Sequence, residues 1–164
     1  MRGYQPVMSF GEDVAPTYRD VLRGDEAAAV AFLEQLAGSG PALELAIGAG
    51  RIALPLAARG IRVDGVDISQ AMVDQLHTRP GGDQLSVTIG DFADVPVPGA
   101  YCLIYVVWNT LFNLLTQEDQ VRCFRSVAFK RRPSLDNFLN RIYIHHLLFE
   151  ISHHILQIHD CVLR

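Results

Sequence analysis

The sequence predicts an α/β fold: a Rossmann-like parallel sheet sandwiched by helices, incomplete because only about four strands can be placed. Short apolar segments alternate with helical segments between residues 25 and 128, and this alternation is typical of parallel βαβ units. Residues 101–107 form a continuous apolar run, the pattern of a central strand buried on both faces. A glycine-containing turn joins the first strand to the helix that follows it, as in open sheets that bind nucleotides.

The first part of this domain carries a local signal for each element. Asp25 is expected to cap an alanine-rich helix over residues 25–36, which Gly38 ends. The elements that follow are short and apolar, and we expect a strand at 42–47, a helix at 50–59 and a strand at 61–66.

The second part continues the alternation. Ser69 is expected to cap a helix that runs to His77 and stops before Pro80. The remaining elements are a strand at 85–89, the buried strand at 101–107 and a helix at 117–127 that Thr116 caps. Four strands and their helices therefore account for the chain up to about residue 128.

The chain changes in composition after Ala128, so we divide it into a domain of residues 1–128 and a tail of residues 129–164. All 13 glycines lie at or before Gly99, no alanine follows Ala128, and five of the six histidines lie in the tail. These histidines lack the spacing and the partner ligands of a metal site, so none is predicted. Apolar residues in the tail recur at helical spacing and predict an amphipathic helix: Ile144, Leu148, Ile151, Ile155, Ile158 and Val162.

The composition argues against several classes of protein. The net charge of -4 and the pI near 5.8 do not favour nucleic-acid binding, which usually needs a basic face. The apolar segment 138–158 is interrupted by charged residues and histidines, so we expect no membrane-spanning helix. The three cysteines are widely spaced and form no CxxC pattern, which suits free thiols in a reducing cytoplasm.

The candidate site is expected at the carboxyl ends of the strands, where open parallel sheets bind ligands. Gly48 and Gly50 let the backbone turn sharply and approach a ligand closely, because neither carries a Cβ. The amides at the start of the following helix favour an anionic group. Asp67 ends the second strand, where a carboxylate can accept both hydroxyls of a ribose. The combination predicts a cofactor that contains adenosine.

The order of these signals resembles the class I S-adenosylmethionine-dependent methyltransferases, in particular their compact small-molecule members. That family's first motif is an acid followed by alternating glycines, which this chain matches with Glu44, Ala46, Gly48 and Gly50. Alanine stands in place of the first glycine. The second-strand acid of the family corresponds to Asp67, followed by ISQAM, which is typical of the turn beside the adenine.

Later segments extend the resemblance over residues 18–128. The segment GDFAD resembles the adenine motif, and strand 101–107 resembles the strand whose end meets the sulfonium methyl and the substrate. Because alignment can supply most of the acceleration of methyl transfer, no catalytic base is required, and none is evident. The resemblance implies S-adenosylmethionine as cofactor and a small-molecule acceptor, with cofactor contacts from Tyr18, Glu44, Ala46, Gly48, Gly50, Asp67, Ile68, Met72, Asp91, Phe92 and Val107, and with Trp108 and Asn109 on the substrate side.

A second interpretation is a dinucleotide-binding oxidoreductase that uses NAD(P). Residues 48–53, GAGRIA, fit the GxGxxA form of that fingerprint, and Asp67 follows at a suitable distance. Three features count against it. The GDF segment at residues 90–92 has its natural use at the adenine of S-adenosylmethionine. Glu44 stands inside the first strand, where such enzymes usually keep an apolar residue, and the chain is short for a second mononucleotide half plus a substrate domain.

A third interpretation is a truncated or frameshifted remnant that at most binds the cofactor. The tail lacks the glycine turn and the hairpin that complete the sheet of the family it resembles. Strand 101–107 is then expected to be an exposed apolar edge. Self-association through that edge or through the tail helix would follow.

Overall fold

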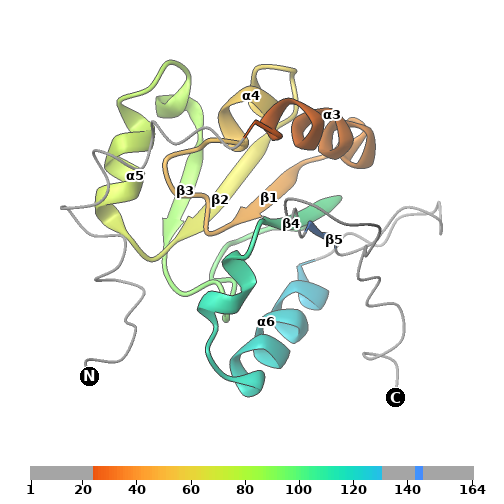
Figure 1. Cartoon of the computed structure of the whole chain (residues 1–164), viewed down its shortest axis with the longest axis vertical. Helices are drawn as coiled ribbons and strands as arrows, with labels where there is room; N and C mark the ends of the chain where they lie inside the picture. The colour runs from red at the N-terminus through yellow and green to blue at the C-terminus, as the bar shows by residue number, and fades with distance from the viewer. Residues whose placement is uncertain (1–23, 131–142, 146–164) are drawn as a thin grey trace.

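The computed structural model describes residues 24–130 and 143–145, and in this part of the chain a single parallel sheet forms the centre of the molecule (Figure 1). Every neighbouring pair of strands is parallel. The strands are β1 (Ala42–Leu45), β2 (Val63–Asp67), β3 (Ser86–Ile89), β4 (Leu103–Val107) and β5 (Tyr143–His145), in the spatial order β3-β2-β1-β4-β5. The α/β prediction with a parallel sheet is confirmed.

Helices cover both faces of the sheet. In Figure 1, α3 and α4 lie on one side of the strands and α6 lies on the other. No helix within residues 24–130 is long and apolar enough to cross a membrane. The helices are α3 (Glu26–Ala37), α4 (Ala53–Ala57), α5 (Gln70–His77) and α6 (Gln117–Phe129), with the 3-10 turns η1 (Gly82–Gln84) and η2 (Thr110–Asn113) between them.

Strand β4 shows why both faces must be covered. Its five residues are all buried, as the continuous apolar run predicts. Tyr105 packs into the cluster that α3 and α4 form, whereas Ile104 packs into the cluster that contains Cys123 and Val127 of α6. The side chains alternate between two apolar layers because successive residues of a strand point to opposite faces.

Two of the three predicted helix caps are present. The Ser69 hydroxyl accepts the backbone N–H of Met72, and Thr116 caps α6 in the same way. Asp25 precedes α3 as predicted but makes no capping hydrogen bond. Its Oδ2 instead accepts a hydrogen bond from the indole Nε1 of Trp108, at 3.4 Å, so a partner 83 residues away replaces the local one.

Strand β5 contradicts the prediction of a helix throughout the tail. Residues 143–145 are a strand that pairs in parallel with residues 105–107 of β4, so the helical interpretation is wrong at Ile144. The backbone of β4 offers a full ladder of hydrogen bonds to a neighbouring strand, and this tertiary pairing overrides a local helical period. The rest of the predicted tail helix lies outside the described residues.

The same pairing adds a fifth strand to the four expected ones and shows that β4 is not an exposed edge. Strand β4 lies between β1 and β5, so its apolar sequence does not form an edge of the sheet. Within the described residues the edges are β3 and β5. Self-association through an exposed β4 edge is therefore not supported by this arrangement.

Substitution of Gly82 by alanine tests the packing between η1 and α5. Gly82 is buried, and a Cβ at this position would overlap the carbonyl oxygen of Leu76. We expect Gly82→Ala to lower the free energy of unfolding by about 1–3 kcal/mol, because backbone must move to admit the methyl group. Urea unfolding measures the change.

The neighbouring residue provides the control. Asp83 is exposed, so Asp83→Ala should change the free energy of unfolding by no more than about 0.5 kcal/mol. Equal unfolding midpoints for Gly82→Ala and wild type would contradict the predicted overlap.

Candidate functional site

A cavity of about 400 Å³ opens where β1, β2 and β4 end. This volume lies within the range of small-molecule sites, about 300–1,000 Å³. The carboxyl edge of a parallel sheet is the expected position for such a site. The predicted residues that line the cavity are Glu44, Ala46, Gly48, Asp67, Ile68, Met72, Asp91, Phe92, Val107 and Trp108.

The turn after β1 is left-handed at all three motif positions. Ala46, Gly48 and Gly50 have φ values of 55°, 56° and 75°. Gly48 lines the cavity, but a Cβ on Gly50 would meet Leu54 and Leu76, so Gly50 serves the packing of the turn instead. Ala46 adopts a conformation that costs an L-residue about 1–2 kcal/mol, which explains why glycine is the more usual residue in this motif.

Asp67 connects this turn to the end of β2. Its Oδ2 accepts the backbone N–H of Gly48 at 2.7 Å, and its Oδ1 accepts the backbone N–H of Ser69 at 2.8 Å. Burial raises the pKa of this carboxyl, and the two amide hydrogen bonds oppose that shift because they favour the charged form. The carboxylate is thus held in one orientation at the cavity wall before any ligand enters.

Glu44 is a buried acid on the same wall. It lies opposite Tyr105 in the β1–β4 register, and the Tyr105 hydroxyl donates to its Oε2 at 3.1 Å. Only 2% of the residue is exposed, and burial raises its pKa from 4.5 to about 8. The hydrogen bond from Tyr105 opposes this shift, whereas the nearby carboxylate of Asp67 adds to it. A carboxyl of this kind is ready to ionise when a cation binds beside it.

Apolar side chains form a second part of the wall. Met72 and Phe92 are buried, and Ile68 is 38% exposed at the mouth of the cavity. The ε-methyl of Met72 would lie 3.3 Å from a Cβ on Gly48, so the two residues are close neighbours. Asp91 lies beside Phe92 and accepts the backbone N–H of Ala93 with its Oδ1 at 2.8 Å.

Trp108 directly follows β4 and lines a different part of the cavity wall. Its φ is 53°, an uncommon value for a bulky residue, and strain of this kind concentrates at functional sites. The guanidinium carbon of Arg51 lies 4.1 Å from the centre of its ring, a cation–π contact. Asn109 is exposed and does not line the cavity, and Tyr18 lies outside the described residues.

Several lining residues were not predicted from the sequence. Arg51 directly follows the glycine motif, and its position beside Gly50 is a signal that sequence reasoning had available. The Arg79 side chain donates to the carbonyl of Ala49 across 30 residues, a contact with no local signature. Within residues 24–130 no group of three His, Cys, Asp or Glu side chains is placed to hold a metal ion. The other unpredicted lining residues are Ile47, Ala49, Thr110, Asn113, Leu114, Leu115, Thr116 and Asp119.

The raised pKa of Glu44 predicts that stability falls as pH rises. The native chain keeps the Glu44 proton up to about pH 8, whereas a solvated glutamate releases it near pH 4.5. Between these values the unfolded state binds fewer protons, so the free energy of unfolding decreases by up to about 1.4 kcal/mol per pH unit for this one group. Asp67 contributes in the same direction.

Glu44→Gln should flatten this dependence, because the amide does not titrate. Urea unfolding between pH 5 and pH 8 measures the slope. Glu118→Gln makes the same change at an exposed position of α6 and should leave the slope as in wild type. A slope for Glu44→Gln as steep as that of wild type would refute the assignment to Glu44.

The chain matches one family model, described as Methyltransferase domain, over residues 42–133. No curated protein matches it in sequence. Among solved structures, it is similar to the CcbJ methyltransferase from Streptomyces caelestis, with 30% identity and a TM-score of 0.75 over 86% of this chain and 58% of that one.

Two further structures share the fold at lower identity. The glycopeptide N-methyltransferase MtfA has 20% identity and a TM-score of 0.62, over 75% of this chain and 54% of that one. DesVI from Streptomyces venezuelae has 16% identity and a TM-score of 0.66, over 89% of this chain and 60% of that one. The chain thus spans between 54% and 60% of the length of these three proteins.

The family match contains every strand from β1 to β4 and all of the residues that line the cavity. Four of the five strands and the cavity at their carboxyl ends therefore belong to the segment on which the match rests, and β5 lies outside it. The dinucleotide-binding oxidoreductase is not favoured by these findings. The chain belongs to the methyltransferase domain family.

Proposed function

We propose that this chain binds S-adenosylmethionine and transfers its methyl group to a small-molecule acceptor by direct in-line displacement. The observation that carries the proposal is the hydrogen bond from the Gly48 amide to the Asp67 carboxylate. It joins the glycine turn and the second-strand acid into one unit on the cavity wall. We infer that a ligand bound to this unit presents its ribose to Asp67 and a neighbouring group to the turn.

The residues present fit such a ligand part by part. Glu44 is placed to pair with the α-ammonium group, and the Asp67 oxygens to accept from the ribose hydroxyls. Ile68, Met72 and Phe92 offer an apolar surface for a flat adenine ring. The acidic and the apolar lining residues thus complement the cationic amino group and the flat adenine ring of the proposed cofactor.

The relatives support the choice of cofactor. The glycopeptide N-methyltransferase MtfA has been solved with S-adenosylmethionine and with S-adenosylhomocysteine bound, at TM-scores of 0.63 to this chain. Since this chain spans little more than half of such proteins, its activity and its acceptor are proposals. We infer that residues 1–128 carry the cofactor half of the site, because every lining residue lies between Glu44 and Asp119.

The bound cofactor would supply an electrophilic methyl group on a sulfonium, and the protein's task is alignment. Glu44 would hold the amino-acid end of the ligand and Asp67 its central ribose, and these two acids are already oriented by Tyr105 and by backbone amides. Trp108, Thr110 and Asn113 line the opposite side and are placed to orient an acceptor. Holding donor and acceptor in line can supply most of the acceleration, so no protein base is assigned.

We also propose a cytoplasmic location, without nucleic-acid or membrane partners. Cys102 and Cys123 are free thiols in the structure, as expected in a reducing compartment. The net charge of -4 gives little attraction for nucleic acid. Tyr18 remains a proposed cofactor contact.

Calorimetric titration of the purified chain with S-adenosylhomocysteine and with NAD tests the function. We expect binding of the first and no measurable binding of the second, because Glu44 and the apolar wall suit the amino-acid and adenine ends of the thioether. Binding of NAD alone would support the oxidoreductase. Binding of neither ligand would support the remnant.

Asp67→Asn tests the ribose role. The asparagine side chain has one acceptor oxygen in place of two, so we expect S-adenosylhomocysteine affinity to fall about 10- to 100-fold, from the loss of about 1–3 kcal/mol of hydrogen bonding. Asp64→Asn is the matched control, because Asp64 lies on the same strand but pairs with Tyr101 and Arg62 away from the cavity. Equal affinities for Asp67→Asn and Asp64→Asn would exclude the role of Asp67.

A further inference from the structure

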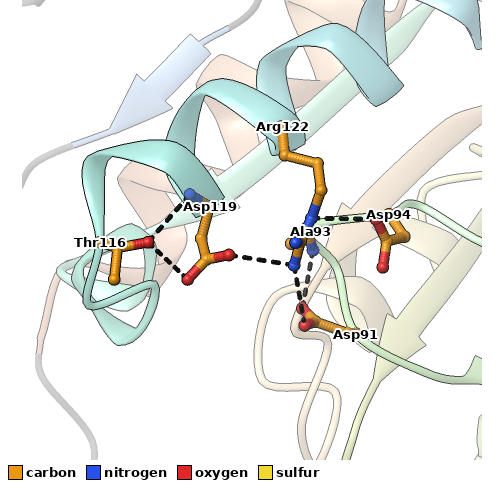
Figure 2. Close-up of polar contacts among 6 residues, drawn as sticks. All are labelled: Asp91, Ala93, Asp94, Thr116, Asp119 and Arg122. Carbon is orange, nitrogen blue, oxygen red and sulfur yellow. Dashed lines mark hydrogen bonds and ion pairs between the residues drawn. The ribbon is translucent and has the colours of Figure 1, made fainter.

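We propose that Arg122 of α6 is a positioning residue for the cofactor. Its guanidinium holds the turn at residues 91–94, whose Asp91 and Phe92 line the cavity, and ties that turn to the start of α6 (Figure 2). The inference rests on the proposed function, since it assigns to this turn the adenine end of the ligand.

Arg122 contacts three carboxylates at once. Its Nε lies 3.0 Å from Asp94 Oδ1, and one terminal nitrogen lies 3.7 Å from Asp91 Oδ2 and 3.1 Å from Asp119 Oδ1. Figure 2 shows the guanidinium between the turn on one side and the first turn of α6 on the other. Asp91 and Asp94 are the first and last residues of the turn, so Arg122 forms an ion pair with each end of it.

The turn also has two internal hydrogen bonds, and Arg122 contacts one of the residues that form them. Asp91 Oδ1 accepts the N–H of Ala93 at 2.8 Å, and the Asp91 carbonyl accepts the N–H of Asp94 at 3.1 Å. Phe92 stands between these bonds with 8% of its surface exposed. The ion pair to Asp91 therefore acts on the carboxylate whose other oxygen holds the turn closed.

The α6 end of the contact is itself fixed. The Thr116 hydroxyl donates to Asp119 Oδ2 at 2.7 Å, and the Asp119 N–H donates to Thr116 Oγ1 at 3.1 Å. Cys123 and Val127 anchor the helix in the core below. Thr116 and Asp119 line the cavity as well, so Arg122 links the adenine side of the wall to the side that faces the acceptor.

The loss of the Arg122 charge is expected to change the 91–94 turn and not the stability of the whole fold. The Arg122 side chain is 46% exposed, and exposed ion pairs contribute little to the stability of a fold. Without Arg122, however, three carboxylates would face one another with no cation between them. Their repulsion would loosen the 91–94 turn and leave the helix and the sheet in place.

The test compares Arg122→Gln with Arg125→Gln. Arg125 is exposed on the same helix and has no ion pair among the described residues, so both variants lose one charge. We expect Arg122→Gln to bind S-adenosylhomocysteine about 5- to 10-fold more weakly and Arg125→Gln to bind as wild type. Arg122→Lys should recover part of the affinity, because an ammonium can neutralise the acids but cannot span all three contacts.

A second readout needs no ligand. Amide hydrogen exchange of Ala93, followed by NMR on the free chain, should be faster in Arg122→Gln than in Arg125→Gln, because the bond to Asp91 opens more often. Faster exchange together with weaker binding supports the proposal. Unchanged exchange at Ala93 overturns it, whatever the affinity, and unchanged affinity overturns it even if exchange rises.

The two proposals fail in different ways. If the wild-type chain does not bind S-adenosylhomocysteine, the proposed function falls and the positioning role with it. If wild type binds and the two glutamine variants bind equally well, the proposed function stands and only the role of Arg122 is lost.

Discussion

The hydrogen bond between the Gly48 amide and the Asp67 carboxylate is the constraint on which the rest of the site depends. It crosses from the turn after β1 to the last residue of β2 and fixes both against the cavity. The Gly48 N–H can donate this bond because the backbone of the turn is left-handed at Ala46, Gly48 and Gly50. The start of α5 is held by the same carboxylate through Ser69. One acid thus orients a turn, a strand end and a helix.

The buried pair of Glu44 and Tyr105 carries a desolvation cost that the fold must offset. This acid is 2% exposed and lies in the core of the sheet, and among the described residues its side chain accepts a hydrogen bond from a tyrosine on the neighbouring strand. An apolar pair of the same size would pack there without a desolvation cost. The unfavourable burial of Glu44 is understandable if the group is kept for a ligand cation and not for the stability of the sheet.

Sequence reasoning located the residues whose placement follows from the order of strands. Glu44 lies near the end of β1, Gly48 lies in the turn after it, and Asp67 ends β2. A parallel sheet necessarily brings those strand ends to one edge. The roles of Gly50 and Asp25 were not foreseen, because the packing of Leu76 and the indole of Trp108 come from distant segments.

Arg122 and β5 were missed for the same physical reason. No residue within one helical turn of Arg122 indicates that the turn at 91–94 is its partner. The helical spacing of apolar residues around Ile144 likewise does not indicate that this segment pairs with the backbone of β4. The spacing of apolar residues in a segment predicts only the secondary structure that the segment favours in isolation. Pairing with a distant strand can override the local preference for a helix.

Trp108 gives the molecule an optical property. It is the only tryptophan in the chain, and its ring stands on the cavity wall between the guanidinium of Arg51 and the carboxylate of Asp25. Indole emission responds to the charges and the water around the ring. A molecule that enters the cavity changes both, so the intrinsic fluorescence of the unlabelled protein reports occupancy of the site with no background from a second tryptophan.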